Sequence, residues 1–408
     1  MRILIVSNLY PPNVIGGYEV LCAEVSEGLA RYGHDVTVLT SCFGGRPADE
    51  TTIIVHQALQ LAVGRTIYDA FPEAAGRREV LNRANTAALL RVVEMARPDV
   101  VFCWNLFGLD EGFLARICAG SIPVVMMLTD NWLVSMTNPS FVGDYFRCGV
   151  YSQPGHEFRV NARQYDTSHT LSASAIFGSA FMRDFHGAAG LRFGSHRVIH
   201  NGIQQPALAD LSLRDRSRIG TRGKVSLLFA GRVVEIKGAH VAVEALGRLR
   251  AERPDNLDFE LSILGSTQDE AYLGRLRQLA EEHGCLEQVR FLDQVPQDIL
   301  PYLFQEYDIL LFPSLYEPFS LTLIHAMASG IPVVASRVGG NTEIVSDGDT
   351  GLLSERNDPT SLASAVTRLA IDATLRSGIS ERGMRVASTF TLERMLTGIS
   401  EYLTTAAS

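Results

Sequence analysis

Residues 225–238 of this 408-residue chain read VSLLFAGRVVEIKG, an apolar run followed by a glycine and two basic side chains. A continuous run of valine, leucine and phenylalanine that ends at a glycine is typical of a strand covered on both faces. Residues 240–250 follow with the spacing of a helix. Strand, loop and helix in this order form the repeating unit of a parallel, doubly wound sheet.

The same alternation occurs on both sides of a polar stretch, residues 204–223, whose composition is typical of a linker. Further strands are predicted at Ile3–Ser7, Val36–Thr40, Val100–Cys103, Val124–Leu128, Ser174–Gly178, Phe259–Leu264, Val289–Leu292, Ile309–Phe312 and Val333–Ser336. Helices are predicted at Tyr18–Tyr32, Glu79–Ala96, His240–Arg250, Ala271–Glu282, Gln297–Gln305, Phe319–Ala328, Pro359–Ile371 and Leu392–Thr404.

This pattern predicts an α/β fold with two Rossmann-like, doubly wound domains. The first domain spans residues 1–203, the linker 204–223 and the second domain 224–388, and a C-terminal helical segment covers 389–408. Ligands of such sheets bind at the carboxyl ends of the strands. Two domains that face a central cleft would suit a large, phosphate-bearing ligand.

Composition and charge restrict the class of protein. The formal net charge is −9 at pH 7, which argues against a nucleic-acid partner because such proteins need a basic stripe. The six cysteines show no CxxC spacing and indicate buried thiols in a reducing, cytoplasmic setting. We expect neither a signal peptide nor a membrane span, although a surface helix could attach the chain loosely to a membrane.

Gly16 and Gly17 lie between the first predicted strand and the first predicted helix. Because glycine has no side chain, the backbone there can approach a bulky anion, and the helix N-terminus offers free N–H groups. The alternative interpretation is a tight turn that binds no ligand.

Arg232 and Lys237 stand five residues apart after the first strand of the second domain. Two cations at the carboxyl end of a strand could neutralise a diphosphate and stabilise it as it leaves. The alternative interpretation is a pair of solvated surface cations.

Residues 316–326, YEPFSLTLIHA, are the most informative segment. Pro318 suits the first turn of a helix, which would place Glu317 at the corner between strand and helix. A carboxylate there could accept hydrogen bonds from sugar hydroxyls, or it could be a helix N-terminal acid. Free N–H groups at the helix start would form a phosphate site, and we assign them to Phe319, Ser320 and Leu321. His325, taken alone, is more typical of a satisfied helix histidine.

The segment Asp347-Gly348-Asp349 has the acid-x-acid spacing of some metal sites. Glycine and aspartate beside the apolar residues 351–353 favour a turn instead. We therefore predict no metal site in this sequence.

These segments together resemble retaining glycosyltransferase family 4, whose members have the GT-B fold. The resemblance covers some 340 residues and depends on the order of its motifs, which are Gly16-Gly17, Gly33-His34-Asp35-Val36, His200-Asn201-Gly202-Ile203, Gly231-Arg232 with Lys237-Gly238, Glu317-Pro318-Phe319-Ser320, residues 330–335, and Gly339-Gly340 with Gly351-Leu352-Leu353. It implies a hexosyltransferase that moves a sugar from a nucleoside-diphosphate sugar to a hydroxyl of a glycan, lipid-linked or small-molecule acceptor.

The resemblance also implies roles for single residues. Gly17 would approach the donor phosphates, Arg232 and Lys237 would bind the diphosphate, and Glu317 would contact the hydroxyls of the donor sugar. The start of the following helix would hold the phosphates through backbone N–H groups. Members need no metal, so the expected ligand is only the donor substrate, a UDP-, GDP-, ADP- or dTDP-sugar. Retention is usually described as front-face attack, and the final helix crosses back onto the first domain.

Two departures from the family pattern stand out. His325 replaces the usual glutamate eight residues after Glu317, and a neutral imidazole can accept only one hydrogen bond from a ribose. We hypothesise weaker ribose binding or a deoxyribose donor such as a dTDP-sugar. Thr129 replaces a usual histidine before Asp130, which could still orient an acceptor hydroxyl or could cap the next segment.

Other interpretations keep parts of this pattern. A non-catalytic relative with the same fold could bind a nucleotide sugar or a partner protein, and solute-binding and phosphorylase-like proteins also have two domains. The acceptor would be selected by loops of the first domain, expected at residues 64–76 and 135–155. The polar or aromatic candidates in and near them are Arg65, Tyr68, Arg77, Arg78, Trp104, Asn105 and Tyr145.

Overall fold

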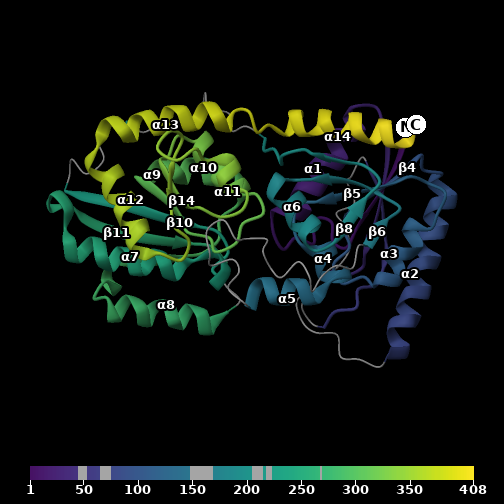
Figure 1. Cartoon of the computed structure of the whole chain (residues 1–408), viewed down its shortest axis with the longest axis horizontal. Coiled ribbons are helices and arrows are strands. Elements are labelled where there is room, and N and C mark those ends of the chain that lie inside the picture. The colour runs from purple at the N-terminus through teal and green to yellow at the C-terminus, as the bar shows by residue number, and fades with distance from the viewer. Residues whose placement is uncertain (45–52, 65–74, 148–168, 205–214, 217–222, 267–268) are drawn as a thin grey trace. The chain divides into compact units, whose positions relative to one another are not determined.

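The computed structural model describes residues 1–44, 53–64, 75–147, 169–204, 215–216, 223–266 and 269–408. The chain forms two compact units, and Figure 1 labels their helices and strands. The first unit contains residues 1–200 and 392–408, and the second contains residues 201–391. We predicted boundaries at 203 and 389, and most of the predicted linker lies outside the described residues.

In the described part of the first unit, seven parallel strands form one sheet in the order β3-β2-β1-β4-β5-β7-β9. The strands are β1 (Arg2–Ser7), β2 (Asp35–Ser41), β3 (Ile54–Leu59), β4 (Val100–Asn105), β5 (Val124–Leu128), β7 (Ser174–Phe177) and β9 (His196–Val198). A smaller parallel pair consists of β6 (His169–Leu171) and β8 (Leu191–Phe193). The helices are α1 (Gly17–Arg31), α2 (Ala75–Ala96), α3 (Glu111–Cys118), α4 (Trp132–Thr137), α5 (Pro139–Arg147), α6 (Ala180–Ala188) and α14 (Leu392–Ala407).

The last helix, α14, belongs to the first unit although it ends the chain. It packs on α1 at Gly28, where a Cβ atom would come within 2.4 Å of Leu396. The adjoining turn adds a hydrogen bond of 2.8 Å between His34 Nε2 and Ser400 Oγ. Chain segments some 360 residues apart are thus joined by packing and hydrogen bonds within one unit, and Figure 1 shows α14 ending close to the N-terminus.

The described part of the second unit repeats this architecture with six parallel strands in the order β12-β11-β10-β13-β14-β15. The strands are β10 (Lys224–Ala230), β11 (Asp258–Leu264), β12 (Val289–Leu292), β13 (Ile309–Phe312), β14 (Val333–Ser336) and β15 (Leu352–Ser354). The α-helices are α7 (Ala239–Glu252), α8 (Glu270–Glu282), α9 (Leu300–Glu306), α10 (Leu321–Ala328), α11 (Asn341–Ile344), α12 (Pro359–Ile371) and α13 (Ala373–Ala387), and the short 3-10 helices include η4 (Glu235–Lys237) and η7 (Gln297–Ile299).

The strand order of the second unit shows where a ligand can bind. From β10 the chain adds β11 and β12 on one side, and it then crosses to add β13, β14 and β15 on the other. The crevice outside the carboxyl ends of β10 and β13 is therefore the switch point, the usual ligand site of a doubly wound sheet. The loops at residues 231–238 and 313–320 begin there. In the first unit, the corresponding point lies between β1 and β4.

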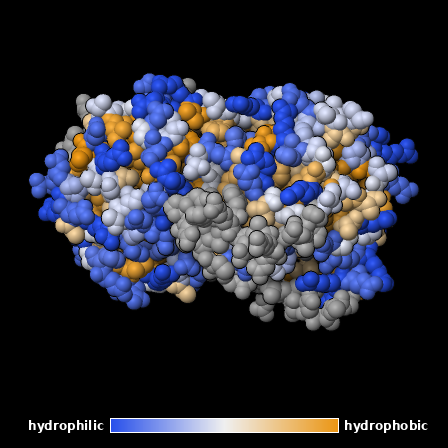
Figure 2. Space-filling view, viewed as in Figure 1, coloured by the Kyte–Doolittle hydropathy of each residue, from blue (hydrophilic) through white to orange (hydrophobic). Residues whose placement is uncertain are grey.

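Burial of apolar side chains explains why these strands could be predicted from the sequence. Leu228, Leu310, Val333 and their neighbours on α10 are fully buried in one cluster, so these strands are covered on both faces. On the face shown in Figure 2, polar side chains are widespread and apolar residues form separate patches. Among the described residues, none of the helices is both long and apolar enough to cross a membrane.

Candidate functional site in the second unit

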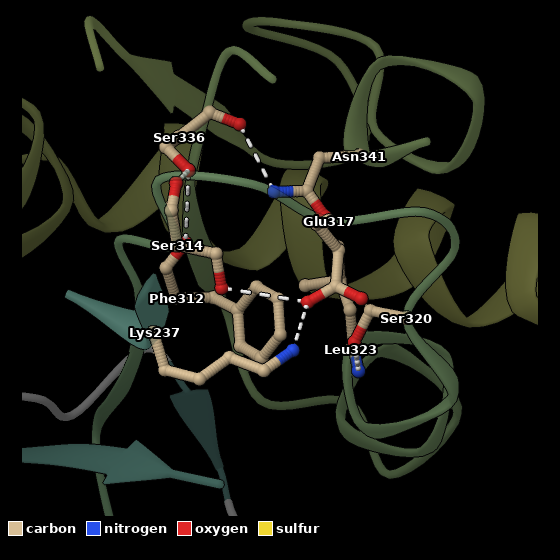
Figure 3. A network of polar contacts seen from close by, with 8 residues as sticks. All are labelled: Lys237, Phe312, Ser314, Glu317, Ser320, Leu323, Ser336 and Asn341. Carbon is tan, nitrogen blue, oxygen red and sulfur yellow. Dashed lines mark hydrogen bonds and ion pairs between the residues drawn. The ribbon is translucent and has the colours of Figure 1, made fainter. Parts of the chain in front are cut away.

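Lys237 and Glu317 meet at the switch point of the second unit. Lys237 ends η4 in the loop after β10, and Glu317 lies in the loop after β13. The Lys237 Nζ atom donates to Glu317 Oε2 at 2.7 Å, and the side chains are 21% and 6% exposed. The ammonium also lies 5.9 Å from the centre of the Phe312 ring. Figure 3 shows this pair, and the structure thus brings together two of the predicted site residues.

A glycine fixes the loop that carries Lys237. Gly238 has a φ of +75°, and a Cβ atom there would lie 2.0 Å from the carbonyl oxygen of Pro313. The backbone N–H of Leu315 donates to the carbonyl of Ile236 at 2.8 Å. Because the two loops touch backbone to backbone, the positions of Lys237 and Glu317 depend on a site that only glycine can fill.

The Glu317 carboxylate is held by side chains from outside the following helix. Its Oε2 atom accepts from Lys237 and, at 3.4 Å, from Ser314 Oγ. Its Oε1 atom has no hydrogen-bond partner among the described residues, so one oxygen remains available to a ligand. The interpretation as a helix N-terminal acid does not describe this geometry.

The helix start differs from the prediction. We predicted Pro318 in its first turn, but α10 begins at Leu321, because the Ser320 side chain accepts from the Leu323 N–H at 3.0 Å and makes Ser320 the N-cap. Phe319 therefore precedes the helix. The N–H groups at the start of α10 are those of Ser320, Leu321 and Thr322, which is one residue later than predicted.

Arg232 lies in the same loop as Lys237, with an exposed side chain. It follows Gly231, whose φ is +151° at the end of β10. The structure thus places both predicted cations in one loop, Lys237 partly buried in an ion pair and Arg232 on the surface.

His325 lies on α10 and is buried. Burial lowers the pKa of its imidazole to about 4, so the ring is neutral at physiological pH. Its Nε2 atom lies 2.9 Å from the amide nitrogen of Gln297 and must accept from it, which places the hydrogen on Nδ1. The Nδ1 atom is buried with no partner in the described part of the chain. The only acceptor nitrogen of His325 is therefore already used, and nothing in the sequence pointed to Gln297 as its partner.

The glycine loop of the first unit has an internal acceptor. Glu19 Oε2 accepts from the Gly16 N–H at 2.9 Å and from the Ile15 N–H at 3.3 Å, and the carboxylate is buried at the start of α1. The N–H of Gly16 is therefore occupied, whereas Gly17 is exposed at the first position of the helix. Sequence reasoning missed Glu19, although a glutamate three residues after an N-cap is a known capping signal.

Asp130 follows β5 in the first unit. Its Oδ1 atom accepts from the Trp132 N–H at 2.8 Å at the start of α4, although the N-cap of that helix is Asn131. Burial raises the pKa of its carboxyl to about 6, and the nearby Glu19 carboxylate adds to this shift. Burial also raises the pKa of the Tyr18 hydroxyl, which donates to the carbonyl of Met127 at 2.9 Å.

Some predicted acceptor residues proved to be core residues. Trp104 is fully buried in β4 and donates to the Tyr18 carbonyl at 3.2 Å, and Tyr145 is buried in α5 against Phe185. Their large apolar rings explain this placement, which corrects the prediction that they line a binding loop. Arg77 and Arg78 are exposed on α2 and Asn105 is buried, whereas Arg65 and Tyr68 lie outside the described residues. Residues 347–349 form the predicted turn, with Gly348 at a φ of +77°.

Two doubly wound units, the second with a largely buried lysine–glutamate pair at its switch point, match the GT-B class of glycosyltransferases. The sequence model for Glycosyltransferase Family 4 matches residues 15–205, and the model for Glycosyl transferases group 1 matches residues 214–386. The chain belongs to glycosyltransferase family 4 and is a hexosyltransferase.

Similar proteins agree with this assignment. The chain is 29% identical to a D-inositol 3-phosphate glycosyltransferase of Acidothermus cellulolyticus over 94% of this chain and 84% of the relative. It is 29% identical to a glycogen synthase of Mycobacterium tuberculosis over 91% of this chain and 86% of the relative. A sucrose-phosphate synthase structure from Thermosynechococcus elongatus has a TM-score of 0.74 at 20% identity, covering 100% of this chain and 99% of that one. The structure of Anabaena HepE in complex with UDP and glucose has a TM-score of 0.68 at 20% identity, and the match covers 99% of this chain and 100% of HepE. These structures confirm the predicted fold.

Proposed function

We propose that this enzyme transfers a hexosyl group from a nucleoside-diphosphate sugar to an acceptor hydroxyl, with retention of configuration and without a metal ion. The observation that carries the proposal is the Lys237–Glu317 pair, which lies at the switch point and leaves one carboxylate oxygen open. A cation, a hydrogen-bond acceptor and the N-terminus of α10 occur together there. These groups match a phosphate joined to a polyhydroxyl ring.

Each group has a separate role in the proposed reaction. Lys237, Arg232 and the first N–H groups of α10 bind the diphosphate and stabilise the charge that develops as the bond to the anomeric carbon breaks. Glu317 Oε1 accepts from hydroxyls of the donor sugar. The acceptor oxygen attacks the same face, its new bond forms at the anomeric carbon, and its proton passes to the leaving phosphate oxygen. Gly17 approaches the donor phosphates, and Asp130 accepts from the acceptor hydroxyl.

The nucleoside part of the donor is proposed from His325. Its acceptor nitrogen is used by Gln297, so the ring cannot accept hydrogen bonds from ribose hydroxyls as a carboxylate would. We therefore expect a donor without the 2′-hydroxyl, such as a dTDP-sugar, to bind at least as tightly as UDP-, GDP- or ADP-sugars. Titration of UDP-, GDP-, ADP- and dTDP-glucose into wild type, His325→Ala and His325→Glu tests this expected order of affinities. Tight ribonucleotide preference that is unchanged in His325→Ala would contradict the role of His325.

The change in melting temperature with the same four nucleotide sugars tests the donor site. A ligand that binds the native state raises the melting temperature by mass action. We expect a shift with at least one nucleotide sugar, its loss in Lys237→Ala and its retention in Lys224→Ala. No shift with any donor in the wild type would overturn the proposal. For the active donor, NMR assignment of the product anomer tests retention, and unchanged rates with a chelator test metal independence.

A further inference from the structure

Glu317 belongs to a closed ring of hydrogen bonds that joins two loops, and Figure 3 shows its links through Ser314, Ser336 and Asn341. The first link involves the backbone carbonyl of Glu317, which accepts from the Gly340 N–H at 2.9 Å. The next residue, Asn341, donates through its amide to the carbonyl of Ser336 at 3.1 Å. The Ser336 hydroxyl donates to the carbonyl of Ser314. Ser314 Oγ then returns to Glu317 Oε2 at 3.4 Å.

The ring fixes both the backbone and the side chain of Glu317. Its members come from the loop after β13 and from the loop after β14, so neither loop can shift without breaking a link. Ser314 and Ser336 are 1% exposed and Asn341 is 0% exposed, so water cannot replace a lost partner easily. Gly340 adds a close contact, since a Cβ atom there would lie 2.2 Å from the Pro318 carbonyl.

Asn341 shows that the ring is maintained at a cost. Its amide nitrogen donates to the Ser336 carbonyl, but its Oδ1 atom is buried and has no partner among the described residues. A buried polar atom without a partner costs about 1–3 kcal/mol, which an apolar residue would avoid. The amide is therefore explained by its donor group, which holds the Ser336 carbonyl in place.

We propose that Ser336 and Asn341 are positioning residues that hold Glu317 Oε1 toward the donor sugar. Neither side chain contacts the carboxylate, and both act through the ring. This inference rests on the proposed function, because it assumes that Glu317 binds the sugar and not the nucleotide. Loss of the ring should therefore weaken binding of a nucleotide sugar and leave binding of the free nucleoside diphosphate unchanged. A merely structural role would weaken both alike.

The chain offers a matched control in Ser354. It pairs with Ser336 in register across β14 and β15, and it is also 1% exposed. Its hydroxyl donates to the carbonyl of Ala335 at 3.5 Å and touches neither loop of the ring. Ser336→Ala and Ser354→Ala thus remove the same atom at the same depth from adjacent strands, and only the first breaks the ring.

Calorimetric titration with the best-binding glucose nucleotide and with its nucleoside diphosphate tests the proposal. For Ser336→Ala and Asn341→Ala we expect affinity for the nucleotide sugar to fall about threefold to tenfold, the value of one neutral hydrogen bond. Affinity for the diphosphate should stay within about twofold, and Ser354→Ala should match wild type in both. Equal losses for both ligands, or no loss in either ring variant, would overturn the positioning role. If wild type bound neither ligand, the proposed function itself would fail.

Discussion

Strand β10 has a lysine–glutamate pair near each of its ends, and the two pairs are similarly short. Lys224 lies 2.5 Å from Glu260 at the start of the strand, and Lys237 lies 2.7 Å from Glu317 beyond its end. The side chains of the first pair are 52% and 19% exposed, against 21% and 6% for the second. Exposed pairs contribute little to stability, whereas buried pairs must offset a large desolvation cost. The buried pair is therefore better explained by ligand binding than by stability.

The use of lysine sharpens this comparison. Lys224 and Lys237 are the only two lysines among the 36 basic residues of the chain. Arginine presents a planar fork of donors, whereas lysine is a compact point charge. At position 237 the ammonium lies between the Phe312 ring and the Glu317 carboxylate. Lysine thus places one compact charge near both the ring and the carboxylate.

The largest expected effect separates the two lysines by activity. Lys237→Ala removes the cation that we propose stabilises the leaving diphosphate, and we expect kcat to fall by about 10²–10³-fold. Lys224→Ala should keep kcat within about twofold, because an exposed pair far from the switch point contributes little. Initial rates at saturating donor measure both. Similar losses of kcat in the two variants would show that the two lysines do not differ in function.

The next effect concerns the glycines that flank β10. Gly223 and Gly238 have φ values of +73° and +75°, but within the described chain only Gly238 has an obstacle, since a Cβ atom there would lie 2.0 Å from the Pro313 carbonyl oxygen. Gly223→Ala should cost about 1–2 kcal/mol of backbone strain. Gly238→Ala should cost about 1–3 kcal/mol more, because the loop must move. Urea unfolding measures the difference, and equal midpoints would show that the two loops are not locked together.

A double-mutant cycle measures the two ion pairs directly. Lys237→Met with Glu317→Gln should give a coupling free energy of about 1–3 kcal/mol, because the two groups are in contact and largely buried. Lys224→Met with Glu260→Gln should give less than about 1 kcal/mol. Free energies of unfolding from chemical denaturation provide both cycles. A larger coupling in the outer pair would reverse the comparison.

The smallest effect extends the comparison to the first unit, at the end of β5. The pKa of Asp130 is raised from 3.8 to about 6, so the folded protein holds this proton more tightly than the unfolded chain does. The resulting stability is present at pH 4 and is lost as the pH rises through 6. Asp130→Asn cannot ionise, so it should melt a few degrees higher than wild type at pH 7.5 and close to wild type at pH 4. A difference that does not vary with pH would contradict the raised pKa.

Much of the fold was predictable because its signals are local. The runs 225–230 and 309–312 are buried on both faces, and each nearly coincides with an observed strand. Among the elements that the sequence did not reveal are β3 and α13. β3 reads IVHQAL and is only partly buried at the edge of the sheet, so its apolar run is short. α13 has few apolar residues, and its buried set includes Arg376 and Ser380.

The candidate site was less predictable because its contacts are not local. Lys237 and Glu317 are 80 residues apart, and their contact follows from a strand order that the sequence does not state. Gln297 meets His325 across 28 residues for the same reason. The start of α10 was wrong by two residues because the Ser320 cap competes with Pro318 as a start signal. Glu19, by contrast, carried a local capping signal that could have been used.

The central claim is that the Lys237–Glu317 pair binds the donor, and the two lysines allow one direct measurement. Both can be labelled by reductive methylation and followed by mass spectrometry, with and without a saturating mixture of UDP-, GDP-, ADP- and dTDP-glucose. We predict that the mixture slows labelling of Lys237 by about tenfold, as expected when a site is about 90% occupied, and leaves Lys224 unchanged. Labelling of Lys237 that is equally fast with and without the mixture would contradict the claim.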